Sequence, residues 1–113
     1  MFMGRVVGTV WSTVKWEKLE GLKFLVVRPY HLADLAPGMV AKPHPFTMYD
    51  GVVAGDVLGA GVGEDVIVAY GHSARVAVEP DLPDGQLPSR PIDAAVVAIV
   101  DHYHVEDAAK DNA

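Results

Sequence analysis

The chain has 113 residues, of which 50% are hydrophobic and 21% charged, and this composition predicts one folded domain rather than a disordered chain or two domains. The net charge of −6 argues against a nucleic-acid partner, since proteins that bind phosphate backbones usually present a basic surface. Cysteine is absent, which excludes disulfides, a thiol nucleophile and cysteine-ligated metals. The longest apolar run, residues 94–100, is far shorter than the roughly 20 residues that span a bilayer, so we expect no membrane segment.

Valine far outnumbers leucine along the chain, and β-branched residues favour strands over helices. All the prolines fall within residues 29–45 and 80–91, which indicates two loops, because proline cannot donate to a β-ladder. The apolar runs between these loops predict five strands, at residues 5–14, 23–28, 52–58, 65–70 and 94–102.

In several of these runs both faces of the predicted strand are apolar, as at residues 24–27 and 94–100. Two apolar faces predict a closed barrel whose outer face meets loops or another subunit. The segment 71–75 resembles one short helical turn, with Ser73 as a possible N-cap. We therefore expect an all-β domain over residues 1–105 and a flexible tail over residues 106–113.

The glycine cluster at residues 59–63 invites comparison with a phosphate-binding loop. A dinucleotide-binding fingerprint needs a third glycine where this chain has Glu64, and a helix where it has an expected strand. We therefore interpret the cluster as a tight connection with positive φ angles, or as a close approach of backbones, and we expect no cofactor.

Other side chains are candidates for chemistry, but none has a specific pattern. His102 and His104 could share a metal with His31 or His44, although no spacing supplies three fixed ligands, and we expect no metal. Ser73 beside His72 lacks an identifiable third group. The candidate carboxylates for acid–base chemistry are Asp50, Asp56, Glu64, Asp65, Asp93 and Asp101, and the aromatics that could stack on bases are Trp11, Trp16, Tyr30 and Tyr70. We expect no enzyme, and a barrel that binds a small ligand or nucleic acid remains an alternative.

Four segments together resemble the bacterial microcompartment vertex proteins, the EutN/CcmL-type (BMC-P) family. Residues 4–13 and 19–27 resemble its first two strands. Residues 59–64 read G-A-G-V-G-E and residues 71–75 read G-H-S-A-R, similar to the family's G-A-G-x-G-E and G-S-S-A-R, with His72 where the family often has serine. Residues 91–101, P-I-D-A-A-V-V-A-I-V-D, are close to P-x-D-A-A-V-V-G-I-V-D.

The resemblance implies a five-stranded, OB-like β-barrel that assembles as a cyclic pentamer and caps the vertices of a polyhedral protein shell. The role is structural rather than catalytic, in the bacterial cytoplasm, with the chain itself and hexameric and trimeric shell proteins as partners. Within that assembly we expect a loop close to the five-fold axis, made of Gly59, Ala60, Gly61, Val62, Gly63 and Glu64. We expect a subunit interface at His72, Ser73, Ala74 and Arg75.

Overall fold

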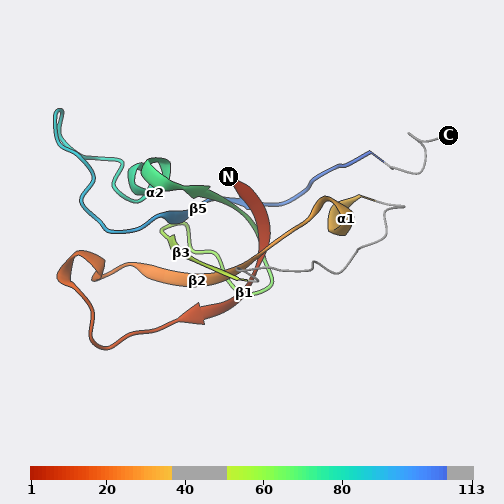
Figure 1. Ribbon diagram of the computed structural model, residues 1–113, viewed down its shortest axis with the longest axis horizontal. Helices are drawn as coiled ribbons and strands as arrows, with labels where there is room; N and C mark the ends of the chain where they lie inside the picture. The colour runs from red at the N-terminus through yellow and green to blue at the C-terminus, as the bar shows by residue number, and fades with distance from the viewer. Residues whose placement is uncertain (37–50, 107–113) are drawn as a thin grey trace.

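A computed structural model describes residues 1–36 and 51–106, and its strands form a closed barrel (Figure 1). The neighbouring strands follow one another around the barrel in the order β1-β2-β3-β5-β4. The elements along the chain are β1 (Phe2–Val10), the 3-10 helix η1 (Glu17–Leu19), β2 (Lys23–Pro29), α1 (Leu32–Leu35), β3 (Val52–Asp56), β4 (Asp65–Tyr70), α2 (Gly71–Val78) and β5 (Ala94–Val100). The predicted five-stranded barrel is confirmed.

Two antiparallel pairs, β1 with β2 and β4 with β5, supply most of the ladder. The parallel pairing of β3 with β5 spans only Gly55 and Asp56 on the β3 side. At Gly4 the strands approach so closely that an added Cβ would collide with the Arg28 carbonyl oxygen, so this position requires glycine.

Several strand ends differ from the sequence prediction. The first strand begins at Phe2 rather than at residue 5, the second ends at Pro29 rather than at residue 28, and the third ends at Asp56 rather than at residue 58. The first strand ends at Val10 rather than at residue 14, because Phe24 is the last β2 residue to pair with it. The fifth strand ends at Val100 rather than at residue 102, because its partner Asp65 is the first residue of β4. His102 and His104 therefore follow the strand and do not share one of its faces.

The inside of the barrel is filled almost entirely by aliphatic side chains. Val6, Leu25, Val27, Val66 and Val68 are fully buried there, together with Ala54, Ala60, Ala94 and Val96. Their alternation with outward-facing residues such as Arg5 and Val7 follows the period of two of a pleated strand.

A second apolar cluster lies on the outer surface of the strands, where Ala95 of β5 packs with Ala74 of α2, Leu22 and Ile92. Gly55 of β3 lies beneath it, since an added Cβ would be 3.3 Å from Leu22 Cδ2. This cluster explains why β5 is apolar on both faces. The expectation that the outer face meets loops is confirmed here, whereas Val7 and Val53 remain about half exposed.

The helical content exceeds the single turn predicted from sequence. The expected turn at residues 71–75 is an eight-residue helix, α2, and its N-cap is Tyr70 rather than Ser73. A further turn, α1, lies within the first proline-containing stretch, which was expected to be loop. The proposed tail is described only at its first residue, Glu106.

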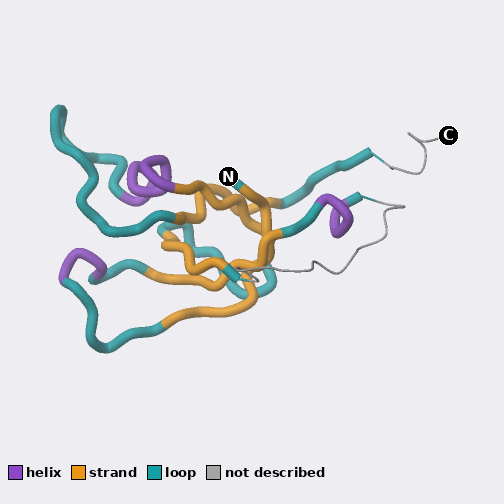
Figure 2. Tube along the Cα trace, in the orientation of Figure 1, coloured by secondary structure: helices purple, strands orange, loops and turns teal. Residues whose placement is uncertain are grey.

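Long connections extend from the barrel on two sides (Figures 1 and 2). The β1–β2 connection and the connection between α2 and β5 extend in the same direction, whereas α1 and the segment after β5 extend in the opposite one. The barrel thus carries two elongated features at one end.

Candidate functional site

The connection between β3 and β4 is built around one buried carboxylate, that of Asp56 at the end of β3. Its Oδ1 accepts a hydrogen bond from the Leu58 N–H at 3.1 Å, and its Oδ2 accepts from Gly59 N–H at 3.1 Å and Ala60 N–H at 2.9 Å. Aspartate commonly caps its own following turn in this way. Asp56, a candidate acid–base group from sequence, is therefore a residue that holds the loop.

Further hydrogen bonds fix the rest of the same connection. Lys23 Nζ donates to the Ala60 carbonyl oxygen at 2.6 Å and lies 3.9 Å from Asp56 Oδ2. The Glu64 Oε1 atom accepts from Gly61 N–H at 2.8 Å, and Gly63 N–H donates to the Val6 carbonyl oxygen at 2.8 Å. The connection is therefore held by the side chains of Lys23 in β2, Asp56 in β3 and its own Glu64, and by the backbone of β1.

The glycines of this connection have different roles. Gly59 and Gly63 have φ angles of 84° and 94°, so the predicted tight connection with positive φ is confirmed at these two positions. Gly61 has no positive φ, and an added Cβ would lie at an ordinary 3.6 Å from Glu64 Oε1. A strand, β4, follows the connection, so no helix N-terminus is present there to hold a phosphate.

The exposed surface of the connection is apolar. Val57, Leu58 and Val62 are 53%, 48% and 63% exposed. Ala60, by contrast, is fully buried among the residues inside the barrel, so its side chain supports the connection from within. A connection held by hydrogen bonds and displaying large aliphatic side chains is suited to contact with another protein surface.

The second predicted surface lies on α2, directly after β4. His72 and Ser73 are exposed and Arg75 is half-buried, and among residues 1–36 and 51–106 no carboxylate pairs with Arg75. Ala74 is fully buried in the outer apolar cluster, so within one subunit its side chain packs inward and is not on the exposed face of α2. His72 and Ser73 share no hydrogen bond in the described part of the chain, so they do not form a nucleophile–base pair.

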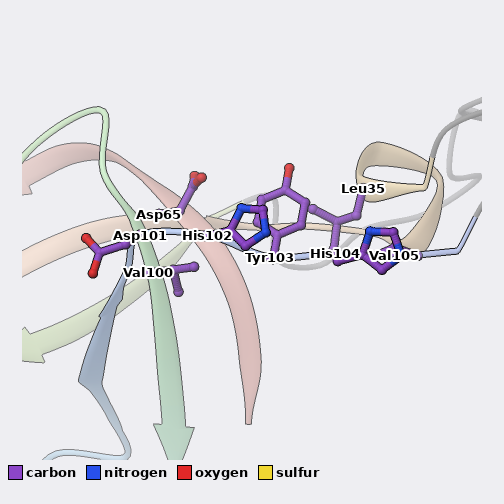
Figure 3. A pocket seen from close by; sticks show the side chains of 8 residues that line it. All are labelled: Leu35, Asp65, Val100, Asp101, His102, Tyr103, His104 and Val105. Carbon is purple, nitrogen blue, oxygen red and sulfur yellow. The ribbon is translucent and has the colours of Figure 1, made fainter.

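A cavity of about 420 Å³ lies between α1 and the segment after β5, lined by Leu35, Asp65, Val100, Asp101, His102, Tyr103, His104 and Val105 (Figure 3). Figure 3 shows Asp101, His102 and His104 spread along the segment rather than converging on one point. No group of three or more potential metal ligands occurs in the described ranges. His44 and Asp50 lie outside the described residues.

Asp65 at the rim of this cavity has a structural role. Its Oδ1 accepts a hydrogen bond from Tyr30 Oη at 2.6 Å and lies 3.7 Å from Arg5 Nε. Burial, and then the hydrogen bond to Asp65, raise the pKa of Tyr30. Burial and the nearby Asp93 raise the pKa of Tyr70. Both tyrosines are neutral at physiological pH, and Tyr30 joins the end of β2 to β4.

Comparison with known proteins identifies the fold and the family. A family model described as "Ethanolamine utilisation protein EutN/carboxysome" matches residues 1–101. The chain belongs to the EutN/CcmL family. It is 39% identical to the carboxysome shell vertex protein CcmL of Synechococcus elongatus over 95% of this chain and 90% of the relative. It is 44% identical to the microcompartment shell vertex protein GrpN of Rhodospirillum rubrum over 89% of this chain and 93% of GrpN.

Solved structures of EutN/CcmL proteins agree with the same assignment. The chain superposes on Gloeobacter violaceus CcmL with a TM-score of 0.67 at 33% identity, covering 93% of this chain and 90% of that one. It superposes on the pentameric GrpN of Rhodospirillum rubrum with a TM-score of 0.61 at 39% identity, covering 93% and 98% of the two chains. The prediction of a microcompartment shell vertex protein is confirmed, and these relatives give no support to a ligand-binding barrel, a nucleic-acid-binding barrel or an enzyme.

No helix in the described parts of this EutN/CcmL chain combines the length and hydrophobicity needed to cross a membrane. Two residues hold the β3–β4 connection: Asp56, which sequence reasoning considered only as an acid–base group, and Lys23, which it did not consider. The signal for Asp56 was present, because an aspartate shortly before glycine is typical of a capped turn. The contact of Lys23 has no local signal, since Ala60 is 37 residues away in sequence.

Proposed function

We propose that five copies of this chain form a ring that closes a vertex of a bacterial microcompartment shell, in the bacterial cytoplasm and without a catalytic role. The observation that carries this proposal is the agreement in sequence and fold with GrpN, solved as a pentamer, over 93% of this chain. Its partners are further copies of itself and the hexameric and trimeric proteins that make up the faces of such a shell.

In this ring the β3–β4 connection lies close to the five-fold axis, where each loop meets copies of itself. Its support is the combination of hydrogen bonds to Asp56, which fix the backbone, with glycines, which permit close approach. Gly59, Gly61, Val62, Gly63 and Glu64 would line the axis, and Ala60 would support them from inside the barrel.

The exposed residues of α2 contribute to the contact between neighbouring subunits. Arg75 carries the argument, because its guanidinium has no carboxylate partner among the described residues and can donate several hydrogen bonds to a neighbouring backbone. Arg75→Ala should weaken the ring on dilution while leaving the barrel folded, and Arg75→Lys should weaken it less. A ring unchanged by Arg75→Ala would remove this residue from the interface.

Native mass spectrometry tests the ring itself. Five chains of 12.1 kDa give an assembly of 60.5 kDa, which we expect at micromolar concentration. A 12.1 kDa monomer at every concentration would contradict the proposal, and a six-fold ring would contradict the vertex role.

A further inference from the structure

The connection between α2 and β5 (residues 79–93) extends away from the barrel and contains a tight turn at residues 83–86 (Figure 2). The Gln86 N–H donates to the Pro83 carbonyl oxygen at 3.1 Å, and Gly85 has a φ of 83°. A positive φ at the third residue is typical of a type II turn, which favours glycine there. Asp84 and Gly85 at the centre of this turn form the only Asp–Gly pair of which both residues lie in the described ranges.

The Asp84 carboxyl group is exposed, and no described residue forms a hydrogen bond or an ion pair with it. Asp56 is the contrasting case, because its carboxylate oxygens accept hydrogen bonds from three backbone N–H groups. The Asp65 carboxylate is held as well, by Tyr30 and Arg5. A carboxyl group held by donors must lose them before it can turn toward its own main chain. Asp84 has no such contacts to lose.

The backbone amide that follows Asp84 is equally accessible. Gly85 is exposed, and its N–H donates to no backbone acceptor among the described residues. A Cβ added at Gly85 would meet nothing within 4 Å, so the space around this part of the chain is open. Glycine also has no side chain that could obstruct the approach of a carboxyl carbon to its nitrogen. The two groups that would have to meet are therefore adjacent in sequence and both unoccupied.

We propose that Asp84–Gly85 is a modification site at which aspartate converts spontaneously to isoaspartate through a cyclic succinimide. In the first step the Gly85 nitrogen attacks Cγ of the protonated Asp84 carboxyl group. A C–N bond forms, the bond from Cγ to the hydroxyl oxygen breaks, and the hydroxyl leaves with the amide hydrogen as water. The inference does not depend on the proposed ring, because every reacting atom belongs to one chain or to water.

In the second step water opens the succinimide. Addition of water at Cγ breaks the new C–N bond and restores aspartate. Addition at the main-chain carbonyl carbon of Asp84 breaks the original peptide bond and leaves the chain connected through Cγ, which is isoaspartate. One water is released and one is consumed, so the isomerisation needs no other reactant. The product has the mass and charge of the original chain, and its main chain is longer by one methylene group.

The contacts around the turn confine the effect of the reaction. Ring closure requires the turn to open, which breaks the hydrogen bond from Gln86 N–H to the Pro83 carbonyl oxygen. Exposed turns of this kind open at far lower free energy than a core does. Beyond the turn the connection is fixed, since Glu79 Oε2 accepts from Ser89 N–H at 2.7 Å and Ile92 is buried in the outer apolar cluster. Isomerisation should therefore alter the turn and leave the free energy of unfolding of the barrel nearly unchanged.

Peptide analysis of the aged protein tests the site. The folded, full-length chain is kept in neutral buffer, sampled over time and digested with a protease that cleaves before aspartate but not before isoaspartate. Cleavage at Asp84 should be lost about tenfold faster, or more, than cleavage at Asp81, which is also exposed but precedes the bulky Leu82. The uncleaved peptide should have an unchanged mass, which distinguishes isomerisation from oxidation. The same digest reports on the other Asp–Gly pair, Asp50–Gly51, separately.

Two variants of the same residue provide the matched controls. Asp84→Glu retains the carboxyl group and its charge, but its longer side chain would have to close a larger ring, so no isomer should accumulate at this position. Asp84→Asn should form the same succinimide with loss of ammonia, and water should then yield aspartate and isoaspartate with a measurable change in mass. Urea unfolding of both variants should match the wild type, since no described residue contacts the Asp84 carboxyl group through a hydrogen bond or an ion pair.

The wild-type chain aged in urea shows that the digest can detect the product, because an Asp–Gly pair in an unfolded chain is free of any restraint by the fold. If the unfolded chain isomerises at Asp84 and the folded chain does not, the turn or the assembly protects the pair and the proposal is wrong. Loss of cleavage at Asp84 no faster than at Asp81 in the folded protein would overturn it as well. Native mass spectrometry measures the ring separately, so neither result depends on the other.

Discussion

Two valines close together in sequence, one in the barrel and one in the β1–β2 connection, occupy opposite environments. Val6 in β1 is fully buried, whereas Val14 is 93% exposed. The barrel thus buries the apolar side chains of its interior, and the β1–β2 connection presents an apolar side chain that no described residue covers. The difference separates residues that fold the chain from residues that assemble it, and two measurements distinguish them: urea unfolding of the dissociated chain, and the concentration at which the ring dissociates.

The largest expected effect on folding is at the centre of the barrel. Leu25 is fully buried, so Leu25→Ala should lower the free energy of unfolding by about 2 to 5 kcal/mol through lost burial and a cavity. Urea unfolding at low protein concentration measures this change. Leu87→Ala is the opposite case, since Leu87 is 81% exposed and its truncation should leave urea unfolding nearly unchanged. A comparable loss of monomer stability in both variants would break the distinction between the two regions.

The next largest effect concerns the residue that holds the β3–β4 connection. Asp56→Ala removes the acceptor of three backbone N–H groups and should cost about 1 to 3 kcal/mol in urea unfolding. Asp56→Asn retains one acceptor oxygen and should cost less. Because the same loop is proposed to lie at the axis, Asp56→Ala should also weaken the ring. If Asp56→Ala leaves the free energy of unfolding in urea unchanged, the β3–β4 connection does not depend on this carboxylate.

These first two positions also show what the sequence could predict. Leu25 lies in a continuous apolar run, so its burial in a two-faced barrel follows from local pattern. The strand ends depend on partners far along the chain, as with Phe24 opposite Val10, and could not be read locally. The burial of Ala60 and Ala74 could not be predicted locally either, because a small side chain gives no sequence signal of whether it faces the core or the solvent. The motif at residues 59–64 was one of four segments that together indicated the family, yet the conformation of its glycines came only from the structure.

Two alanine substitutions in the proposed axial loop compare a glycine that needs its positive φ, Gly63, with one that does not, Gly61. Gly63→Ala should cost about 1 to 2 kcal/mol in urea unfolding, because its φ of 94° is unfavourable for any residue with a Cβ, although the surrounding space is open. Gly61→Ala should change urea unfolding very little, since its φ is ordinary and the added Cβ meets Glu64 Oε1 at 3.6 Å.

The two glycine variants separate backbone strain from crowding between copies. If the loops converge at the axis, Gly61→Ala should weaken the ring despite its small effect on the dissociated chain. A Gly61→Ala ring with wild-type dissociation would remove the crowding argument for axial placement. A Gly63→Ala chain of wild-type stability would instead show that the loop relaxes around the substitution.

The smallest expected effect is at the Tyr30–Asp65 hydrogen bond, which lies within one subunit. Tyr30→Phe should lower the free energy of unfolding by about 1 kcal/mol at pH 7 to 8. Folding raises the pKa of Tyr30, chiefly by burial and then by the bond to Asp65, so the folded state favours its neutral form. This stabilisation is fully present below the pKa of about 10 for an unfolded tyrosine and is lost as pH rises through the higher folded value.

The stability difference between the wild type and Tyr30→Phe should therefore shrink as pH rises above about 10. Burial, and then Asp93, also raise the pKa of Tyr70. Because Tyr70 is present in both proteins, its contribution to the pH dependence cancels in the difference between them. Urea unfolding at several pH values between 8 and 11 measures the difference. A constant difference across that range would show that folding does not raise the pKa of Tyr30. Ring dissociation at pH 7 should be the same in both proteins, because Tyr30 links the end of β2 to β4 inside one barrel and belongs to the residues that fold the chain.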